Sequence, residues 1–206
     1  VPRGSGFADD VATASTGIPA QRMLMDRIVD AFRSGAAALA AQPGVKVAGP
    51  GMLPRGEGED EQRPLVFVTD TASLRADDSA VREECFGPVI VIVEHDGEAD
   101  LVAAIDQLPG GLTATLHAAD GEPGALADVV AALEESAGRV LFGGWPTGVA
   151  VAWSQHHGGP YPATTSLFTS VGATAIRRFL RPLAFQTAPD AILPVELRDA
   201  PAELPR

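Results

Sequence analysis

Apolar and polar residues recur along the chain in two rhythms, one typical of helices and one of strands. From Pro19 to Gly44, apolar residues return every three or four positions, which predicts a helix with one buried stripe. The expected stripe consists of Leu24, Ile28, Phe32, Ala36 and Leu39. Pro19 suits a first helical turn, and Gln42-Pro43-Gly44 ends the helix. The preceding residues 7–17 are small and polar, so we expect a loose arm there.

Short runs rich in β-branched residues predict the strands. They lie at residues 45–48, 64–70, 89–94, 112–117 and 140–142. The run VIVIVE at 89–94 is apolar at nearly every position, which indicates a strand covered on both faces.

Helices are predicted between the later strands. Asp96 is expected to cap a helix that carries Leu101, Ile105 and Leu108 on one face. Pro123 is expected to open another, with Leu126, Val130 and Leu133 facing inward and Gly138 at its end. Strands that alternate with helices through short connections favour right-handed crossovers and a mainly parallel sheet. The predicted class is therefore α/β.

Two other segments have a different composition. Residues 49–63 are rich in Gly, Pro and acid and predict an exposed loop, and residues 143–162 predict a loop shaped around a site. Thr169 or Ser170 is expected to cap a helix that runs through Phe179, and Leu183–Gln186 is expected to form a last short strand before a Pro-rich tail.

Composition narrows the function classes. Hydrophobic residues make up 46% of the 206 residues, enough to form a core, and the net charge of −12 disfavours binding to nucleic acid or to anionic membranes. A single cysteine cannot form an internal disulfide, so we expect a reducing, cytoplasmic location. Residues 1–5 (VPRGS) resemble the remnant of a cleavable tag and are set aside.

Two residues could carry chemistry. Cys85 follows two glutamates whose charge would raise the pKa of the thiol, which favours a small buried hydrophobe over a nucleophile. His157, after His156 and before a Gly-Gly-Pro turn, could act as a base or as a polar loop residue. We find no second cluster at metal-ligand spacing and expect no metal site. Phosphate-cradling glycine motifs are also missing from the sequence.

One motif connects the chain to a known family. EECFGP at 83–88 resembles the Glu-Glu-x-Phe-Gly-Pro motif of the aldehyde dehydrogenase superfamily. GRVLFGGWPTGV at 138–149, HGGPYPAT at 157–164 and TSVGATAIRRFLRPLAFQ at 169–186 are similar to one branch of it. That branch contains NADP-dependent α-ketoglutaric semialdehyde (2,5-dioxovalerate) and fatty-aldehyde dehydrogenases. The likeness covers nearly all of residues 14–195.

The resemblance implies roles for three residues. Glu84 matches a glutamate that accepts hydrogen bonds from the nicotinamide ribose, and Phe86 matches an aromatic residue beside the nicotinamide ring. His157 matches a histidine near the catalytic thiol. The implied cofactor is NADP, with NAD as an alternative, and the implied reaction is oxidation of an aldehyde to a carboxylic acid through a thioester.

The resemblance also implies an architecture. It indicates a three-layer α/β sandwich of the aldehyde dehydrogenase catalytic-domain type, truncated so that residues 6–206 form its C-terminal part. The nucleophilic cysteine and the Rossmann half would then lie outside this chain, and the chain alone would be inactive. The strand near 183–186 resembles one at the family's subunit interface, so we expect a homo-oligomer, either dimer or tetramer, in the complete enzyme.

Two hypotheses compete with this one. The chain could be a non-catalytic α/β binding or oligomerisation module derived from the same fold. It could also be an enzyme that pairs Cys85 with His157 as a new thiol site.

Overall fold

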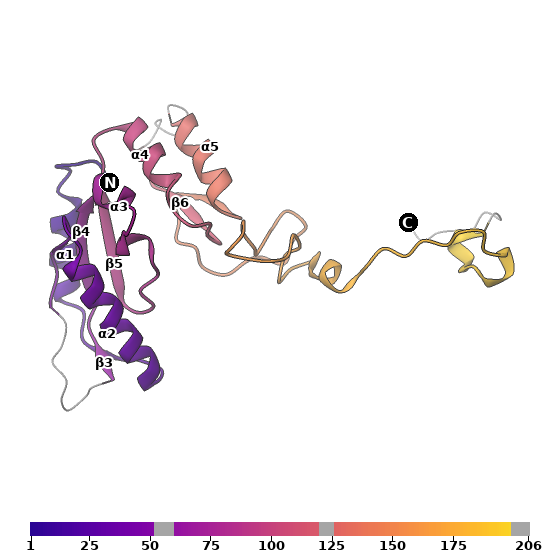
Figure 1. Cartoon of the computed structure of the whole chain (residues 1–206), viewed down its shortest axis with the longest axis horizontal. Helices are drawn as coiled ribbons and strands as arrows, with labels where there is room; N and C mark the ends of the chain where they lie inside the picture. Colours follow the sequence, from indigo (N-terminus) through magenta and orange to yellow (C-terminus); the bar gives the residue numbers. More distant parts are fainter. Residues whose placement is uncertain (52–59, 120–125, 199–206) are drawn as a thin grey trace.

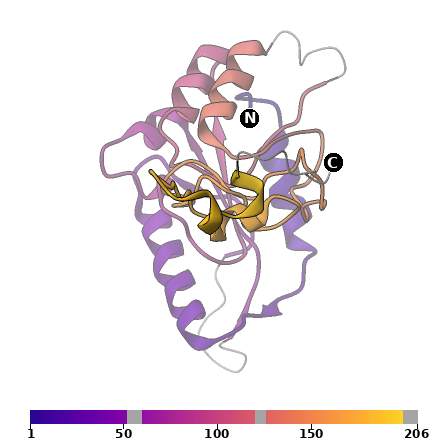
Figure 2. The ribbon, with the colours of Figure 1, turned by 90° about the vertical axis from the view of Figure 1, so that its right-hand side faces the viewer.

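A computed structural model describes residues 1–51, 60–119 and 126–198 of the chain. Two small α/β layers form a body, and the chain then leaves it as an extended C-terminal arm, which we define as residues 175–198 (Figure 1). In the view from the arm's side, the arm projects toward the viewer from the body (Figure 2). Among the described residues, no helix is long and apolar enough to cross a membrane.

The first layer is a three-stranded sheet in the order β2 (Lys46–Val47), β4 (Leu65–Asp70), β5 (Val89–Glu94). β4 and β5 are parallel and in register from Leu65 opposite Val89 to Asp70 opposite Glu94. β2 pairs with β4 in the antiparallel direction. The predicted strands at 64–70 and 89–94 are thus confirmed, and the sheet is mixed.

Helices cover β4 on both faces. Leu65 and Phe67 pack in one core cluster with Phe32 and Leu39 of α2 (Asp26–Ala41). The residue between them, Val66, is fully buried on the opposite face, because successive side chains of a strand alternate. On that face α1 (Phe7–Thr16) contacts β4. β4 is therefore enclosed between α1 on one face of the sheet and α2 on the other.

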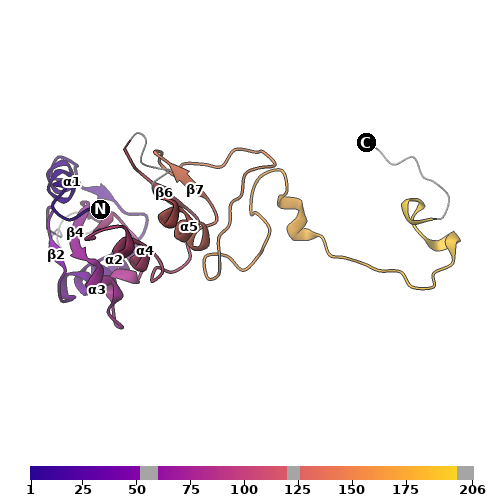
Figure 3. The ribbon, with the colours of Figure 1, turned by 90° about the horizontal axis from the view of Figure 1, so that it is seen from above.

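The second layer contains a parallel pair of strands, β6 (Ala114–Leu116) and β7 (Val140–Phe142). α4 (Glu98–Ile105) packs beside α5 (Ala127–Ser136), and Ile105, Val129 and Ala132 form its core. Figure 3 shows β6, β7 and α5 between the first sheet and the arm. The strand predicted at 140–142 is confirmed, and the one predicted at 112–117 is shorter than expected.

The expectation of one mainly parallel sheet is only partly right. β5 and β6 belong to different sheets, and the first residues of the chain occupy the edge of β5 instead. The Val1 ammonium donates to the carbonyl of Val93 (2.9 Å), the His95 amide donates to the carbonyl of Val1, and the Arg3 amide donates to the carbonyl of His95. Residues 1–3 are thus part of the folded structure, while their origin as a tag stays a prediction.

Two expectations at the start of the chain are wrong. Residues 7–16 form a helix and not a loose arm, since Ala12 and Ser15 are buried and two aspartates favour its N-terminal turn. α2 begins at Asp26, seven residues after Pro19, and Leu24 is 83% exposed. The buried face of α2 consists of Val29, Phe32, Ala36 and Leu39.

The residues before α2 belong to a separate two-stranded sheet. β1 (Gln21–Arg22) pairs with β3 (Glu61–Gln62) in the antiparallel direction. β3 lies inside the stretch 49–63 that was expected to be a loop, whereas most of that stretch, like Pro123, lies outside the described residues.

Asp96 does not cap α4. Gly97 occupies the cap position, and the Asp96 carboxylate binds Arg3 (2.6 Å). The carboxylate that organises this region is Asp100, which accepts hydrogen bonds from the Asp96 amide, the Thr71 hydroxyl and the Arg75 guanidinium. These donors, the amide foremost, lower the pKa of Asp100 to about 2. Asp100 thereby ties α4 to α3 (Thr71–Arg75).

The end of the chain also departs from expectation. The helix predicted from Thr169 or Ser170 is reduced to a 3₁₀ turn, η3 (Ala175–Phe179), because Thr169 and Ser170 bind His157. No strand forms at 183–186 within the described part of the chain; Leu183 and Phe185 are exposed. In the described parts of the chain, 3₁₀ turns also lie at η1 (Ala80–Arg82), η4 (Asp190–Ile192) and η5 (Val195–Leu197).

We predict that Asp100→Asn lowers the Tm at neutral pH, because the neutral amide accepts more weakly from Arg75 and from the Asp96 amide. A carboxylate with a depressed folded-state pKa stabilises the fold above its unfolded pKa of about 3.9, and that stabilisation is lost as the pH falls toward about 2. Thermal melts from pH 7 to pH 2 should therefore show a smaller acid-dependent fall in Tm for the variant. Glu134→Gln, at an exposed carboxylate on α5, is the matched control. An equal fall in Tm for Asp100→Asn and wild type would contradict this role.

Candidate functional site

The segment EECFGP lies between η1 and β5, beside α2. Cys85 packs into α2: its Sγ approaches the carbonyl oxygen of Phe32 (3.5 Å), and a Cβ on Gly35 would come within 2.9 Å of that sulfur. Burial raises the pKa of the Cys85 thiol. This environment disfavours the thiolate and agrees with the small-hydrophobe interpretation, although the cause is burial and not the charge of the two preceding glutamates.

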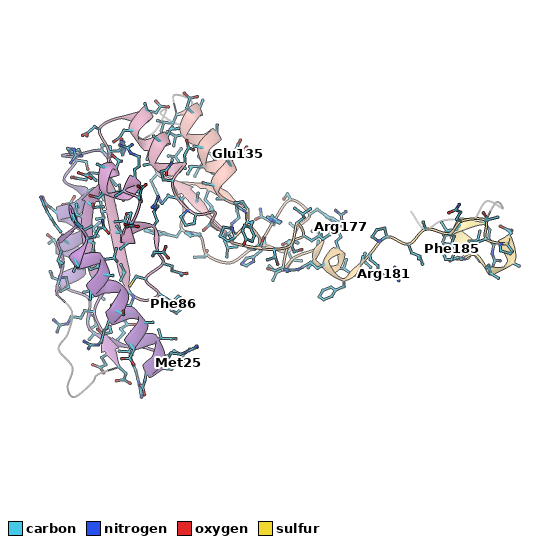
Figure 4. The ribbon with its side chains drawn as sticks, in the orientation of Figure 1. Met25, Phe86, Glu135, Arg177, Arg181 and Phe185 are labelled. Carbon is cyan, nitrogen blue, oxygen red and sulfur yellow. The ribbon has the colours of Figure 1, made fainter. Side chains whose placement is uncertain are left out.

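The neighbours of Cys85 face outward. Phe86 is 62% exposed, and Glu84 is exposed and accepts no hydrogen bond from another described residue. Figure 4 shows Phe86 on the right-hand side of the body, above Met25. Gly87, which follows at a φ of 155°, packs against the Phe32 ring so closely that a Cβ would collide with it. The backbone is therefore fixed directly beside two free side chains.

His157 lies in a different place, in the loop after β7. It lines a cavity of about 350 Å³ whose wall comes from the residue before β7, the loop after β7 and the residues before β6. The lining residues are Leu112, Thr113, Arg139, Pro146, Thr147, Gly148, Val149, His156, His157 and Val171. Neither Glu84 nor Phe86 lines this cavity, and no hydrogen bond joins them to His157 in the described part of the chain.

Close backbone contacts hold the turn that follows His157. A Cβ on Gly138 would overlap the carbonyl of Gly158, and a Cβ on Gly159 would overlap the carbonyl of Gly111. Gly110 likewise packs against Pro160. The HGGP turn thus sits directly on the ends of two elements of the second layer, which only residues without side chains allow.

Arg139 holds the other wall of the cavity. Its guanidinium donates to the carbonyl oxygens of Gly148 (3.1 Å) and Thr147 (3.4 Å). Sequence patterns alone did not single out Arg139, although its place between Gly138 and the strand at 140–142 was a usable signal. The sequence pattern predicts Thr169 and Ser170 as helix caps, but both bind His157 instead.

Within residues 1–51, 60–119 and 126–198, no three His, Cys, Asp or Glu residues are grouped so that they could hold a metal ion.

Comparison with known proteins decides the family. A family model described as "Aldehyde dehydrogenase family" matches residues 34–160, which include EECFGP, β7 and the His157 turn. The chain belongs to the aldehyde dehydrogenase family. Among individual relatives, it is 37% identical over 190 residues to an α-ketoglutaric semialdehyde dehydrogenase of Acinetobacter baylyi. It is 40% identical over 203 residues to α-ketoglutaric semialdehyde dehydrogenase 2 of Azospirillum brasilense.

These alignments cover most of this chain and a smaller share of the relatives. They span 92% and 97% of the chain but 36% and 38% of the two enzymes. The aldehyde dehydrogenase segment described here therefore corresponds to little more than a third of each enzyme.

Solved structures agree on the fold. The Δ-pyrroline-5-carboxylate dehydrogenase of Mycobacterium tuberculosis superposes with a TM-score of 0.58 at 23% identity, over 76% of this chain and 27% of that one. A double mutant of betaine aldehyde dehydrogenase from Staphylococcus aureus, solved with NAD⁺, superposes with a TM-score of 0.55 at 18% identity, over 77% of this chain and 30% of that one. The α/β class is thus confirmed as part of the aldehyde dehydrogenase fold, with small sheets.

We predict that Gly138→Ala lowers the free energy of unfolding by about 1–3 kcal/mol, because the new methyl group must displace the Gly158 carbonyl. Chemical denaturation measures the loss. Gly144→Ala is the matched control, since a Cβ added at Gly144 would meet nothing within 4 Å. If both variants are equally stable, the HGGP turn does not rest on Gly138.

Proposed function

We propose that this chain forms the C-terminal part of the catalytic domain of an NADP-dependent aldehyde dehydrogenase that oxidises a semialdehyde to the carboxylic acid. The observation that carries the proposal is the identity of 37% and 40% to two α-ketoglutaric semialdehyde dehydrogenases over nearly the whole chain. The semialdehyde and the preference for NADP over NAD come from the resemblance to that branch of the family.

Glu84 and Phe86 fit a nicotinamide nucleotide. A carboxylate only accepts hydrogen bonds, and the exposed Glu84 has no other described donor, so it can receive both hydroxyls of a ribose. The exposed face of Phe86 offers an apolar surface to a planar ring. The bound nucleotide would supply hydride-accepting chemistry, and this chain's residues would bind and orient it.

His157 fits the role of a base. His157 lines the cavity, and the turn that follows it is held by close backbone contacts. Its imidazole is therefore kept at the wall of this cavity. An imidazole in such a position can take a proton from a thiol or from water near neutral pH. The raised pKa of the Cys85 thiol and its place against α2 argue against a new pair of Cys85 with His157.

The chimera that tests this function replaces the matching segment of the Azospirillum relative with this chain. We expect NADP-dependent oxidation of α-ketoglutaric semialdehyde, and Glu84→Gln should lower kcat/KM about tenfold or more, because two charge-assisted hydrogen bonds become neutral. Steady-state kinetics and cofactor binding measure both effects.

Glu83→Gln, at the neighbouring glutamate, is the control and should leave the kinetics unchanged. A folded chimera with no turnover would favour the alternative function, a non-catalytic α/β binding or oligomerisation module. Unchanged kinetics for Glu84→Gln would remove this residue from the cofactor site.

We further propose that the C-terminal arm attaches to a second copy of the enzyme. Its apolar residues Ile176, Phe179, Leu180, Leu183 and Ile192 are 64–86% exposed in the single chain. The arm carries four arginines and two acids, Asp190 and Glu196, in a chain of net charge −12, so its small positive charge complements the acidic body of another copy. Figure 4 shows Arg177, Arg181 and Phe185 along the arm, away from the body.

We predict that Phe179→Glu shifts the chimera toward monomers, because a charge replaces an apolar anchor in the interface. Size-exclusion chromatography with light scattering measures the mass. Leu167→Glu is the control, since Leu167 is 94% exposed but lies outside the arm. A dimer or tetramer that persists in Phe179→Glu would overturn the assignment of the arm.

A further inference from the structure

Residues 169–171 enclose the backbone of His157 and meet its ring. The buried Thr169 hydroxyl accepts from the His157 amide (2.9 Å) and donates to the carbonyl of Val171 (2.6 Å). The Ser170 amide donates to the carbonyl of His157 (2.9 Å). Both sides of the His157 peptide are therefore held, so the ring's position relative to Ser170 is set by the backbone.

The Ser170 hydroxyl contacts His157 twice. Its Oγ lies 2.6 Å from Nδ1 of the ring and 3.2 Å from the carbonyl oxygen of the same residue. A hydroxyl has one proton to donate and two lone pairs. Both contacts are hydrogen bonds only when the Ser170 proton points to the carbonyl and Nδ1–H donates to Oγ. The reverse arrangement would leave two oxygen lone pairs facing each other at 3.2 Å.

We infer that Ser170 is a positioning residue that holds neutral His157 in the tautomer with the proton on Nδ1. The lone pair of the ring then resides on Nε2, which receives no hydrogen bond from any described residue. The bond made by one ring nitrogen fixes the state of the other. A ring in this state accepts a proton at Nε2, and Nδ1–H keeps its bond to Ser170 after the ring becomes charged.

The catalytic meaning of this inference rests on the proposed role of His157, but its test does not. The chain contains four histidines, so long-range ¹H–¹⁵N spectra of its imidazoles are simple, and His157→Gln identifies the signals of His157. At about pH 8.5, where an ordinary imidazole is neutral, the coupling pattern shows which ring nitrogen carries the proton. We expect Nδ1 in the wild type.

Three variants sharpen the measurement. Ser170→Ala should shift His157 toward the Nε2–H form, while Ser170→Thr, which keeps the hydroxyl, should retain Nδ1–H. Ser166→Ala, which removes a hydroxyl that binds the Phe168 amide in the same loop, should leave the His157 signals in place. Backbone amide spectra show whether each variant is folded.

A wild-type His157 in the Nε2–H form overturns the inference, whatever the variants do. So does a folded Ser170→Ala variant in which the tautomer is unchanged. In the active chimera, Ser170→Ala should lower kcat at least several-fold with little change in KM, and Ser170→Thr should restore it. If the tautomer responds as expected but kcat does not, the positioning role stands and the proposed catalytic role of His157 fails.

Discussion

The burial of β4 between two helices is the constraint on which the body depends. β4 is the central strand of its sheet, and its Phe67 lies in one buried cluster with Phe32 of α2, while α1 contacts β4 as well. Each of these apolar side chains contributes roughly 1.5–3 kcal/mol by leaving water. The Phe32 ring also packs against Gly87, and the backbone carbonyl of Phe32 lies close to the Cys85 sulfur. Phe32 therefore belongs both to the core and to the contacts that hold the EECFGP segment.

The His157 site is built in another way. Its parts are held by backbone contacts: glycines pack on carbonyls at Gly138 and Gly159, and the Arg139 guanidinium binds two carbonyl oxygens. Such contacts bring loops together without an apolar core, and each depends on a missing side chain or on a single donor. The placement of His157 therefore depends on which positions carry no side chain, whereas that of β4 depends on the burial of large apolar side chains.

Sequence patterns predicted the strands and helices whose large apolar side chains must be buried. The runs at 64–70 and 89–94 indicated β4 and β5, because strongly apolar β-branched segments require a core. α1 was missed, since its buried residues are alanine and serine and leave no apolar rhythm. The separation of the two sheets depends on which backbone reaches the edge of β5, and that is a long-range contact without a local signal. Thr169 and Ser170 carry a genuine capping pattern, but His157, twelve and thirteen residues away, takes their hydroxyls.

The EECFGP motif indicated Glu84 and Phe86 as candidate site residues, but the burial of Cys85 that lowers its reactivity is visible only in the structure. Cys85 is the single cysteine of the chain, and its thiolate is suppressed by burial. Each unit by which a thiol's pKa rises lowers the thiolate fraction about tenfold at a fixed pH below it. A thiol-directed label applied at neutral pH would therefore react with Cys85 more slowly than with an exposed cysteine whose pKa is not raised.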